Sequence, residues 1–512
     1  MKKLFSLAVT FGLVFCLVCS LSAETIILLH SNDTHGTFKP YKFKVDGKKR
    51  LVGGMEAVSH YLNKIRAEEN NVLLIDLGDV MTGTPATDVE YEGVIGGAMM
   101  EFLNRLEYDV WGCGNHVFDR GQQNALGIIK LARFPTVMAN IIYKESGKLF
   151  PVQPYHIFDK AGLKVGVIAV MEENFLSEVR RESVAGLDVL PIVPTLKAYV
   201  PVLDKQTDLI VVLSHGRFEQ AMRIAENIQG IDVVLVAAED GRFQEVNGVL
   251  IKSTFGHQRT LGYLRVEVED DKVVNHEEKL IWLWADVELN PSSQVTSLVE
   301  KMDALISLDY AKVVGEAKSD LTIELYPRYG EIEESTLGNW ITDVMRWKTG
   351  AQIGLQNSGG IRANISAGPI TKADIFKVSP FHNTLVVFKL TGRQVKDALE
   401  HDLERGQDRM QVSGIKYKYY SRLARSFGAR IDYVEINGEE LVKKGRILHP
   451  EKIYTVVSND YLVGHAEDKY FGFPAADPYD TGLILDQTLI EWLVKHKVLD
   501  YRPKKRIMNI VK

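Results

Sequence analysis

Cysteine is scarce in this chain, and its distribution excludes a fold held together by disulfides. The 512 residues contain three cysteines, of which Cys16 and Cys19 fall in the apolar N-terminal segment. If that segment is removed, Cys113 is the one cysteine left, so no internal disulfide can form. This composition is compatible with export but gives no independent support for it.

Strong charge of one sign is also absent. The formal net charge is -6, and no basic block interrupts a sequence that is 25% charged and 46% hydrophobic. Proteins that bind nucleic acids usually carry a basic face, so we expect no nucleic-acid partner. Internal repeats and low-complexity segments are lacking as well. A chain of this length and composition predicts a globular protein with more than one domain.

One long hydrophobic run is present, and it lies at the N-terminus. Two lysines precede a nearly continuous apolar stretch, residues 4–21, and small residues follow up to Ala23. This pattern predicts a signal peptide, residues 1–23, and export to the periplasm or the extracellular space with no membrane contact after cleavage. An uncleaved anchor is the first alternative, because the run is almost long enough to span a bilayer. Lipid attachment at a cysteine of the run is the second, although a bulky residue precedes each cysteine.

Several apolar runs in the first half end in clusters of polar residues. Five of them lead into "HSNDTHG", "LGDVMTG", "GNHVFD", "LSHG" and "AAEDG". Between them lie amphipathic segments such as residues 53–69 and 218–229, which predict helices. Alternating strands and helices predict a layered α/β architecture, in which ligands collect at the carboxyl ends of the strands. A single Asp after a strand is often a helix cap, but capping does not explain five polar endings.

The residues at these strand ends are of types that bind divalent metals. Asp33 and His35 are two positions apart, so both side chains can point to one side of an extended segment. Asp79 lies in a glycine-flanked turn, and Asn115 and His215 end two later strands. Carboxylate, imidazole and amide oxygen together suit Mn, Zn, Mg or Fe rather than a thiolate site. Two such ions close together can clamp a phosphoryl group.

The motifs "HSNDTHG", "LGDVMTGT", "GNHVFD" and "LSHG" resemble, in this order, those of the calcineurin-like metallophosphoesterases. With the second half of the chain, they resemble the 5′-nucleotidase family, which includes UDP-sugar hydrolases and 2′,3′-cyclic-nucleotide phosphodiesterases. The resemblance covers nearly the whole chain after the N-terminal segment. It implies an N-terminal four-layer α/β sandwich at residues 24–290, a linking helix at 291–311 and a C-terminal α/β nucleotide-binding domain at 312–512.

The resemblance also implies roles for the polar residues of the first half. Two divalent ions (Mn, Zn, Mg or Co) would share a bridging Asp79. The other implied metal ligands are Asp33 and His35 on the first ion, and Asn115 and His215 on the second. His116 and Asp119 would form the catalytic pair, in which Asp119 orients His116 towards the leaving group or the transition state. The implied reaction is attack of a metal-bound hydroxide on phosphorus.

One motif departs from the family pattern. Where the family usually has Gly-Gly-His-x-His after a strand, this chain has "AAED". Aligned without a gap, Ala238 replaces a ligand of the second metal, and Asp240 replaces a ligand of the first. Alanine cannot coordinate a metal, so we expect a weakened second site, for which Glu239 or His257 are the two candidates to compensate. Loss of even an outer partner of a metal site commonly costs about 10–100-fold in affinity or activity.

The second half of the chain predicts a substrate-binding domain. A helical period in residues 295–311 indicates the linking helix, and "ESTLGNWITDVMRW" predicts another helix. By resemblance, Asn357, Arg362 and Asn383 contact the substrate. The two glycines before Arg362 allow the backbone to approach a ligand closely.

The expected base pocket differs from that of the family. The family commonly stacks the nucleobase between two aromatic rings, but Arg409 occupies the first position, just before "MQVSG". Arginine can stack on a ring and adds charge, so the substrate preference can shift. Tyr470 is the nearest candidate for the second ring, although packing in the core explains it equally well.

Two classes of function remain open. The first is an exported metal-dependent phosphohydrolase that acts on nucleotides, including nucleotide sugars or cyclic nucleotides. The second is a weakened or inactive relative that binds a nucleotide-like ligand, because Ala238 replaces a metal ligand. A related hydrolase of a non-nucleotide ester is a third reading. Retention of the other ligands and of the His116–Asp119 pair favours the enzyme. The expected partner is a small nucleotide, and no oligomeric state follows from the sequence.

Overall fold

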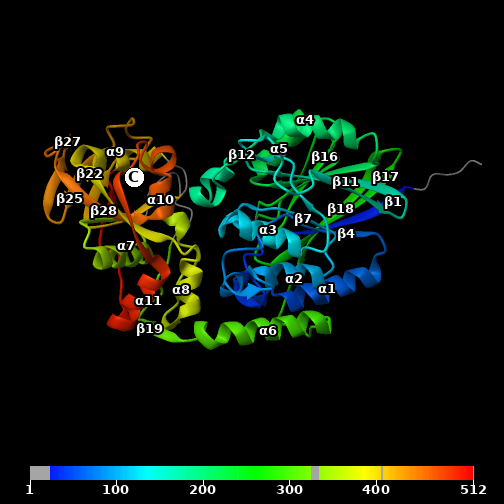
Figure 1. The fold of residues 1–512 in the computed structure, drawn as a ribbon, viewed down its shortest axis with the longest axis horizontal. Coiled ribbons are helices and arrows are strands. Elements are labelled where there is room, and N and C mark those ends of the chain that lie inside the picture. Colours follow the sequence, from blue (N-terminus) through cyan, green and yellow to red (C-terminus); the bar gives the residue numbers. More distant parts are fainter. Residues whose placement is uncertain (1–22, 46, 239, 324–333, 405–407, 511–512) are drawn as a thin grey trace, which may run out of the picture.

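The computed structural model describes residues 23–45, 47–238, 240–323, 334–404 and 408–510 (Figure 1). These residues form two α/β domains that lie side by side, and α6 (Ser293–Tyr310) runs along one edge from the first domain to the second. The predicted signal peptide lies, except for its last residue, outside the described residues. Within the described ranges, no helix is both long enough and apolar enough to cross a membrane.

Two six-stranded sheets form the centre of the N-terminal domain. The first has, in spatial order, β18 (Lys272–Trp282), β17 (Thr260–Glu269), β1 (Glu24–Ser31), β4 (Val72–Asp76), β7 (Val110–Gly112) and β8 (Thr136–Val137). The second has β10 (Tyr155–Lys160), β11 (Leu163–Met171), β13 (Leu209–His215), β14 (Val233–Val236), β16 (Val249–Ser253) and β15 (Phe243–Val246). The run from β1 to β8 and the run from β11 to β16 are parallel, so each sheet has one edge where several carboxyl ends meet.

The two sheets and their helices make four layers. Along β11, Val165 and Val167 pack in the core shared with the first sheet, whereas Ile168 and Val170 pack under helices on the other side. Successive side chains of a strand point to opposite faces, so one apolar run fills two cores. The helices on the second sheet are α4 (Ile192–Leu203) and α5 (Phe218–Asn227), and those on the first are α1 (Met55–Glu68), α2 (Gly97–Arg105) and α3 (Gly121–Leu131). The predicted four-layer α/β sandwich is therefore confirmed.

Three small two-stranded sheets complete this domain. They pair β2 (Tyr41–Val45) with β3 (Lys48–Val52), β5 (Glu90–Tyr91) with β6 (Val94–Ile95), and β9 (Ile141–Tyr143) with β12 (Leu187–Val189). The helical period read from the sequence holds for most of α6, where Val295, Leu298 and Met302 are buried. It fails at Leu305, which is 46% exposed, whereas the next residue, Ile306, packs partly buried against the N-terminal core.

A five-stranded sheet forms the centre of the C-terminal domain. Its order is β23 (Met410–Ser413), β20 (Ile353–Asn357), β28 (Ile453–Asn459), β22 (Thr384–Thr391) and β29 (Ala476–Ile484). One face packs on α7 (Thr336–Thr349), α8 (Lys372–Val378) and α11 (Leu485–His496). The other face packs on α9 (Gly392–Glu404) and a second sheet of β27 (Arg446–Ile447), β26 (Glu439–Lys443), β25 (Ile431–Ile436), β24 (Ile415–Tyr419) and β31 (Ile507–Asn509). A small sheet of β21 (Gly368–Thr371), β19 (Val313–Ala317) and β30 (Val498–Leu499) lies where α6 enters the domain.

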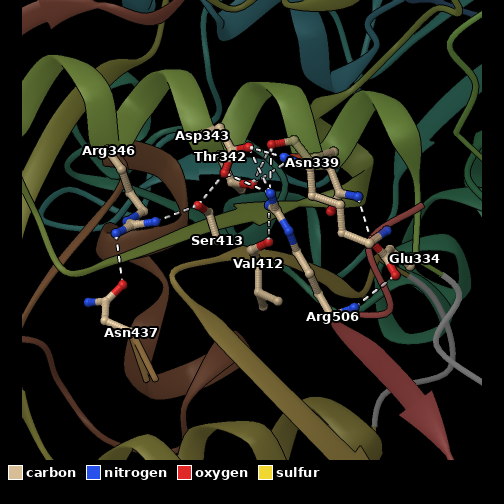
Figure 2. Close-up of polar contacts among 11 residues, drawn as sticks. Glu334, Asn339, Thr342, Asp343, Arg346, Val412, Ser413, Asn437 and Arg506 are labelled. Atoms are coloured by element: carbon tan, nitrogen blue, oxygen red, sulfur yellow. Dashed lines mark hydrogen bonds and ion pairs between the residues drawn. The ribbon is translucent and has the colours of Figure 1, made fainter. Parts of the chain in front are cut away.

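An ion pair between the buried Arg506 and the partly buried Asp343 ties the end of the chain to α7 (Figure 2). Both carboxylate oxygens of Asp343 accept hydrogen bonds from Nη2 of Arg506, at 2.8 and 2.7 Å. Nη1 of Arg506 donates to the backbone oxygen of Val412 at 2.9 Å, and Ser413 donates its hydroxyl to Asp343. Arg506 is 6% exposed, and with these contacts it fixes β31 to the helix and to β23.

Candidate active site

Five of the six residues predicted to bind metal, all except Asp240, converge where the parallel strands of both N-terminal sheets end. Together they line a cavity of about 480 Å³. The residues are Asp33 and His35 after β1, Asp79 after β4, Asn115 after β7, and His215 at the end of β13. Two sets of three have ligand atoms within 4.8 Å of one another, namely His35 with Asp79 and His116, and Asp33 with Asp79 and His215. Asp79 belongs to both sets, which is the arrangement that a bridging carboxylate requires.

Asp79 lies at the centre of these five residues, which we call the Asp79 cluster. Its Oδ2 lies 3.2 Å from Nε2 of His215 and 4.0 Å from Nε2 of His116. Its Oδ1 accepts a hydrogen bond of 2.9 Å from the backbone nitrogen of His116. Nε2 of His215 also lies 3.2 Å from Oδ1 of Asn115. A carboxylate, an amide oxygen and two imidazoles therefore face one small volume, and this donor set fits a divalent cation.

Backbone carbonyl groups orient two histidines of the cluster, His35 and His215. Nδ1 of His215 donates to the oxygen of Leu77 at 2.9 Å, and Nδ1 of His35 donates to the oxygen of Thr82 at 2.7 Å. Each ring therefore turns its Nε2 towards the carboxylates. Such contacts from the outer partners fix the tautomer of a ligand histidine and its direction.

Three residues of the cluster hold a left-handed backbone conformation that only glycine adopts readily. The angle φ is +50° at Asp33, +47° at His35 and +57° at Asp79. Each such residue costs roughly 1–3 kcal/mol and persists only where its surroundings determine it. Here the loops after β1 and β4 are joined by two backbone hydrogen bonds of 2.9 Å. The nitrogen of Asp33 donates to the oxygen of Gly78, and the nitrogen of His35 donates to the oxygen of Asp79. Strained conformations of this kind concentrate at functional sites.

The electrostatics of the cluster favour positive charge. Burial opposes ionisation of Asp79, but His215 and His116 outweigh it and hold the pKa of Asp79 far below its usual range. Burial would by itself lower the pKa of His35 and that of His215. Asp33 and Asp79 nevertheless raise the pKa of His35 to about 9, and Asp79 raises that of His215 to about 10. The carboxylates thus stabilise cations beside them, which is the preference that a divalent metal satisfies.

His116 and Asp119 form a hydrogen-bonded pair beside the cluster. Nδ1 of His116 donates to Oδ2 of Asp119 at 2.8 Å, and the hydroxyl of Thr82 donates to the same oxygen at 2.5 Å. The ring of His116 meets the ring of His35 edge-on at 5.3 Å, and lies 5.7 Å from the ring of Phe381 in the C-terminal domain. Asp119 and Thr82 thus hold the imidazole so that Nε2 remains on the side of Asp79.

A larger cavity of about 730 Å³ lies between the two domains. Its walls include Asn115, His116 and Asp119 from one domain, and Asn357, Arg362 and Asn383 from the other. Arg362, Asn115 and His116 also line the smaller cavity, so the two cavities adjoin at these residues. Oδ1 of Asn383 is buried and has no hydrogen-bond partner among the described residues. A buried acceptor without a partner is costly, so it is suited to receive a hydrogen bond from a ligand.

Asp240 is held by protein groups instead of joining the cluster. It lines the smaller cavity but belongs to neither set of neighbouring ligand atoms. Its carboxylate pairs with Arg242 and accepts a hydrogen bond of 2.5 Å from the hydroxyl of Ser253. Ala238 lines the same cavity without offering a ligand. His257 lies beside His35, with 5.1 Å between their rings, and Glu239 lies outside the described residues.

The two residues predicted to stack on a base are buried elsewhere. Arg409 is 2% exposed and donates to the backbone oxygen of Asp402, near the end of α9, where the helix dipole attracts a cation. Tyr470 is fully buried in the C-terminal core, and its hydroxyl contacts Asp408. Neither is among the described residues that line the larger cavity. The structure therefore does not bring the expected pair of base-stacking residues together.

The sequence did not reveal several residues that do line the larger cavity. They are Phe381, Asp408, Tyr461, Asp468 and Lys469 from the C-terminal domain, and Asn174, Glu178, Arg180 and Arg217 from the N-terminal domain. Tyr461 follows β28, a parallel neighbour of β20. The rule that ligands collect at the carboxyl ends of parallel strands would therefore have found it. The same rule applies to Asn174 and Arg217, which follow the parallel strands β11 and β13, whereas no comparable signal marks the others.

The strand-end ligands, the histidine–aspartate pair and the four-layer sandwich define a calcineurin-like phosphoesterase. Residues 26–258 match the family model of the calcineurin-like phosphoesterases. Residues 313–476 match that of the 5′-nucleotidase C-terminal domain. The chain therefore combines a calcineurin-like phosphoesterase domain with a C-terminal domain of the 5′-nucleotidase type. The resemblance read from the motifs is confirmed.

Proteins with similar sequences include hydrolases of several names. The chain is 25% identical over 475 residues to the endonuclease YhcR of Bacillus subtilis, covering 86% of this chain and 37% of that protein, so it spans little more than a third of that relative. It is 28% identical over 430 residues to a 5′-nucleotidase of Vibrio cholerae, covering 73% of this chain and 75% of the relative. A crystal structure of a 5′-nucleotidase precursor from Thermus thermophilus is similar at a TM-score of 0.82 and 27% identity, covering 96% of this chain and all of the other.

Proposed function

We propose that this protein is an exported hydrolase of nucleotide phosphoesters, with nucleoside monophosphates, nucleotide sugars or cyclic nucleotides as the substrate class. The observation that carries the proposal is the cavity between the domains. His116 and Asn115 line one side of it and Arg362, Asn357 and Asn383 line the other, and it opens onto the Asp79 cluster. Its volume of about 730 Å³ suits a small organic ligand. The names of the Vibrio and Thermus relatives support the same substrate class.

The residues of the cluster would hold two divalent ions. We assign Asp33 and His35 to one ion, Asn115 and His215 to the other, and Asp79 to both. When bound, such ions polarise a phosphoryl group and activate a water molecule. His116, held through Nδ1 by Asp119, would present Nε2 to the leaving group or to the negatively charged phosphoryl oxygens.

The C-terminal domain would hold the rest of the substrate. Arg362 carries a permanent positive charge at the junction of the two cavities, where it would bind phosphate oxygens. Asn383 offers an acceptor that no described residue uses, and Asn357 offers an amide at the end of β20. We propose the limits 24–290, 291–311 and 312–512 for the first domain, the linking helix and the second domain. The apolar residues 4–21 support cleavage of residues 1–23 and export.

The second candidate function is ligand binding without turnover. Ala238 lines the metal cavity where a ligand histidine is expected, and the carboxylate of Asp240 is taken up by Arg242 and Ser253. A second ion held only by Asp79, Asn115 and His215 would bind weakly. On this reading, the larger cavity binds a nucleotide and the chemistry is lost.

Phosphate release by the metal-stripped mature protein tests both candidates. Mn, Zn, Mg or Co is added back separately, and the substrates are AMP, UDP-glucose, 2′,3′-cyclic AMP and an aryl phosphate. Metal-dependent turnover that Asp79→Asn abolishes supports the enzyme, and the substrate panel identifies its class. Folded protein that binds AMP in calorimetry but releases no phosphate with any metal supports the second candidate. Turnover that resists chelation contradicts the metal-dependent mechanism.

A further inference from the structure

A short loop of the C-terminal domain reaches the catalytic histidine. It connects α8 to β22, and its Phe381 lies with its ring 5.7 Å from the ring of His116. The guanidinium of Arg362 lies 5.8 Å from the ring centre of Phe381. Asn383, two residues further along, lines the same cavity. The position of this loop therefore decides how the substrate-binding residues meet His116.

His382, between these two residues, joins the domains. Its Nε2 donates to Oδ2 of Asp88 in the N-terminal domain, and its Nδ1 donates to Oδ1 of Asp486 in α11 at 3.1 Å. Because both acceptors are carboxylates, both ring nitrogens carry hydrogen and the imidazole is positively charged. Arg120 also pairs with Asp88, and the hydroxyl of Tyr310 at the end of α6 donates to Asp88 at 3.3 Å. One carboxylate thus collects contacts from both domains and from the helix that links them.

Asp88 belongs to the same chain segment as the Asp79 cluster. The segment begins at Asp79, and its Thr82 accepts from His35 through the backbone oxygen and donates its hydroxyl to Asp119. It then forms the turn η1 (Pro85–Thr87), which Asp88 ends. This segment of ten residues, 79–88, therefore carries the carboxylate of Asp79 and the contact with His382. Its Thr82 also holds His35 directly and His116 through Asp119. The chain between Asp79 and Asp88 is short and largely buried, so the position of Asp88 is tied to that of the cluster.

The backbone at His382 is strained. Its φ is +51°, in the left-handed region that favours glycine. The side chain is 22% exposed, and that of Asp88 is 15% exposed, so the pair is shielded from bulk solvent more than most surface pairs. Strain at a residue with such specific contacts indicates that those contacts, and not the turn itself, account for a histidine at this position.

We propose that His382 is a positioning residue for ester hydrolysis, which bridges Asp88 and Asp486 and thereby sets Phe381 and Asn383 against His116 across the domain boundary. This inference rests on the proposed function. It explains why the loop that approaches His116 carries a charged residue pointing to both domains. It also assigns a task to Asp88 and Asp486, which lie outside the cavity walls that the described residues form.

The charges around His382 support this assignment. The groups that face it are Asp88, Arg120 and Tyr310 on one side, and Asp486 and the ring of Phe376 on the other. Burial alone would lower the pKa of His382, but its hydrogen bonds to Asp486 and Asp88 raise it to about 9. Relative to a solvated histidine with a pKa of 6.5, the contribution of the bridge is complete below pH 6.5 and is lost as the pH rises through about 9.

The test compares His382→Gln and Asp88→Asn, singly and together, in the metal-loaded mature protein. His449→Gln is the matched control, because it removes an exposed histidine that pairs with Glu439 in the same domain. With AMP as substrate, we expect each bridge variant to raise KM about 10-fold, with kcat changed much less, and the double variant to add little to either. The wild-type KM should rise between pH 8 and 10, whereas the KM of His382→Gln should show no such step. The control should behave as the wild type.

A purely structural role predicts a different outcome. It would lower the melting temperature without changing KM, or the two single effects would add in full, and either result overturns the proposal. His382→Gly relieves the positive φ and so separates a folding defect from loss of the bridge; we expect it to fold and still to show the raised KM. If no variant, the wild type included, hydrolyses a substrate, the proposed function fails. Small-angle scattering then still decides on the bridge, since both bridge variants should increase the radius of gyration, and an unchanged radius refutes it.

Discussion

The Asp79 cluster and the Asp343–Arg506 pair both concentrate charge inside the protein, but they are neutralised differently. Asp343 receives two hydrogen bonds from a guanidinium that is itself buried. By contrast, no described lysine or arginine lies within ion-pair distance of Asp33 or Asp79, which face histidines and the amide of Asn32. A buried charge that is neutralised by an opposite charge of the same chain indicates a structural role. Carboxylates that meet only titratable or neutral partners indicate a place for an external cation.

The two regions also differ in backbone conformation. Asp343 lies in the regular helix α7, and its partner lies just before a strand. Asp33, His35 and Asp79 lie in turns with positive φ. Regular elements and paired charges stabilise the fold, whereas the strained turns bring ligands together at a cost to stability.

The largest expected effect concerns catalysis at the cluster. His116→Ala should lower the rate of phosphate release by about 10²–10⁴-fold, because it removes the imidazole that Asp119 orients. Metal content, measured by elemental analysis, should remain close to that of the wild type, since Asp33, Asp79 and His215 still form a set of ligands. Unchanged turnover in this variant would remove His116 from the mechanism.

The next effect concerns stability at the other region. Arg506→Ala should lower the free energy of unfolding by about 3–5 kcal/mol, because it leaves the carboxylate of Asp343 without its buried partner. Lys504→Ala is the matched control, since Lys504 pairs with the same carboxylate at 3.4 Å but is 52% exposed; its cost should stay below about 1 kcal/mol. Urea unfolding measures both. An equal loss of unfolding free energy in the two variants would contradict a structural role for the Asp343–Arg506 pair. Loss of activity in a folded Arg506→Ala variant would contradict it as well.

A smaller gain is expected from Ala238→His. The variant supplies an imidazole to the metal cavity, and we expect the affinity for the second ion to rise at least about 10-fold. Titration of the metal-stripped protein by calorimetry measures this change. Ala238→Val, which adds volume but no ligand, is the control. If both variants bind metal as the wild type does, Ala238 does not mark a missing ligand.

The smallest effect is the acid response of Asp343. Burial would raise its pKa, but Arg506 and Ser413 hold that pKa below the ordinary value of 3.8. A depressed pKa means that the ion pair contributes fully above pH 3.8 and that this contribution is lost as the pH falls through the lower value of the folded state. The difference in unfolding free energy between the wild type and Asp343→Asn should therefore shrink below about pH 4. A difference that is constant from pH 3 to pH 7 would contradict this.

The sequence was sufficient for the fold class and for the convergence of the strand ends, because both depend on short-range patterns. The pattern of apolar residues identified the strands β1 and β13 and the helices α1, α5 and α6. Because the strands run parallel to their neighbours, the polar residues at the strand ends come together. The directions in which side chains point could not be predicted from the sequence in the same way. Arg409 turns towards the end of α9 and Tyr470 into the core, and neither follows from the spacing of the motifs. The contact between His382 and Asp88 joins residues 294 positions apart, so only the folded arrangement of the domains could reveal it.

The positive φ angles at Asp33, His35 and Asp79 have a consequence for protein engineering. Glycine relaxes each of these turns but deletes a side chain that we assign to a metal. A library selected for heat resistance alone will therefore enrich changes that remove these side chains while the scaffold persists. Thermostable variants of this protein should be sought by scoring survival and turnover in the same round of selection.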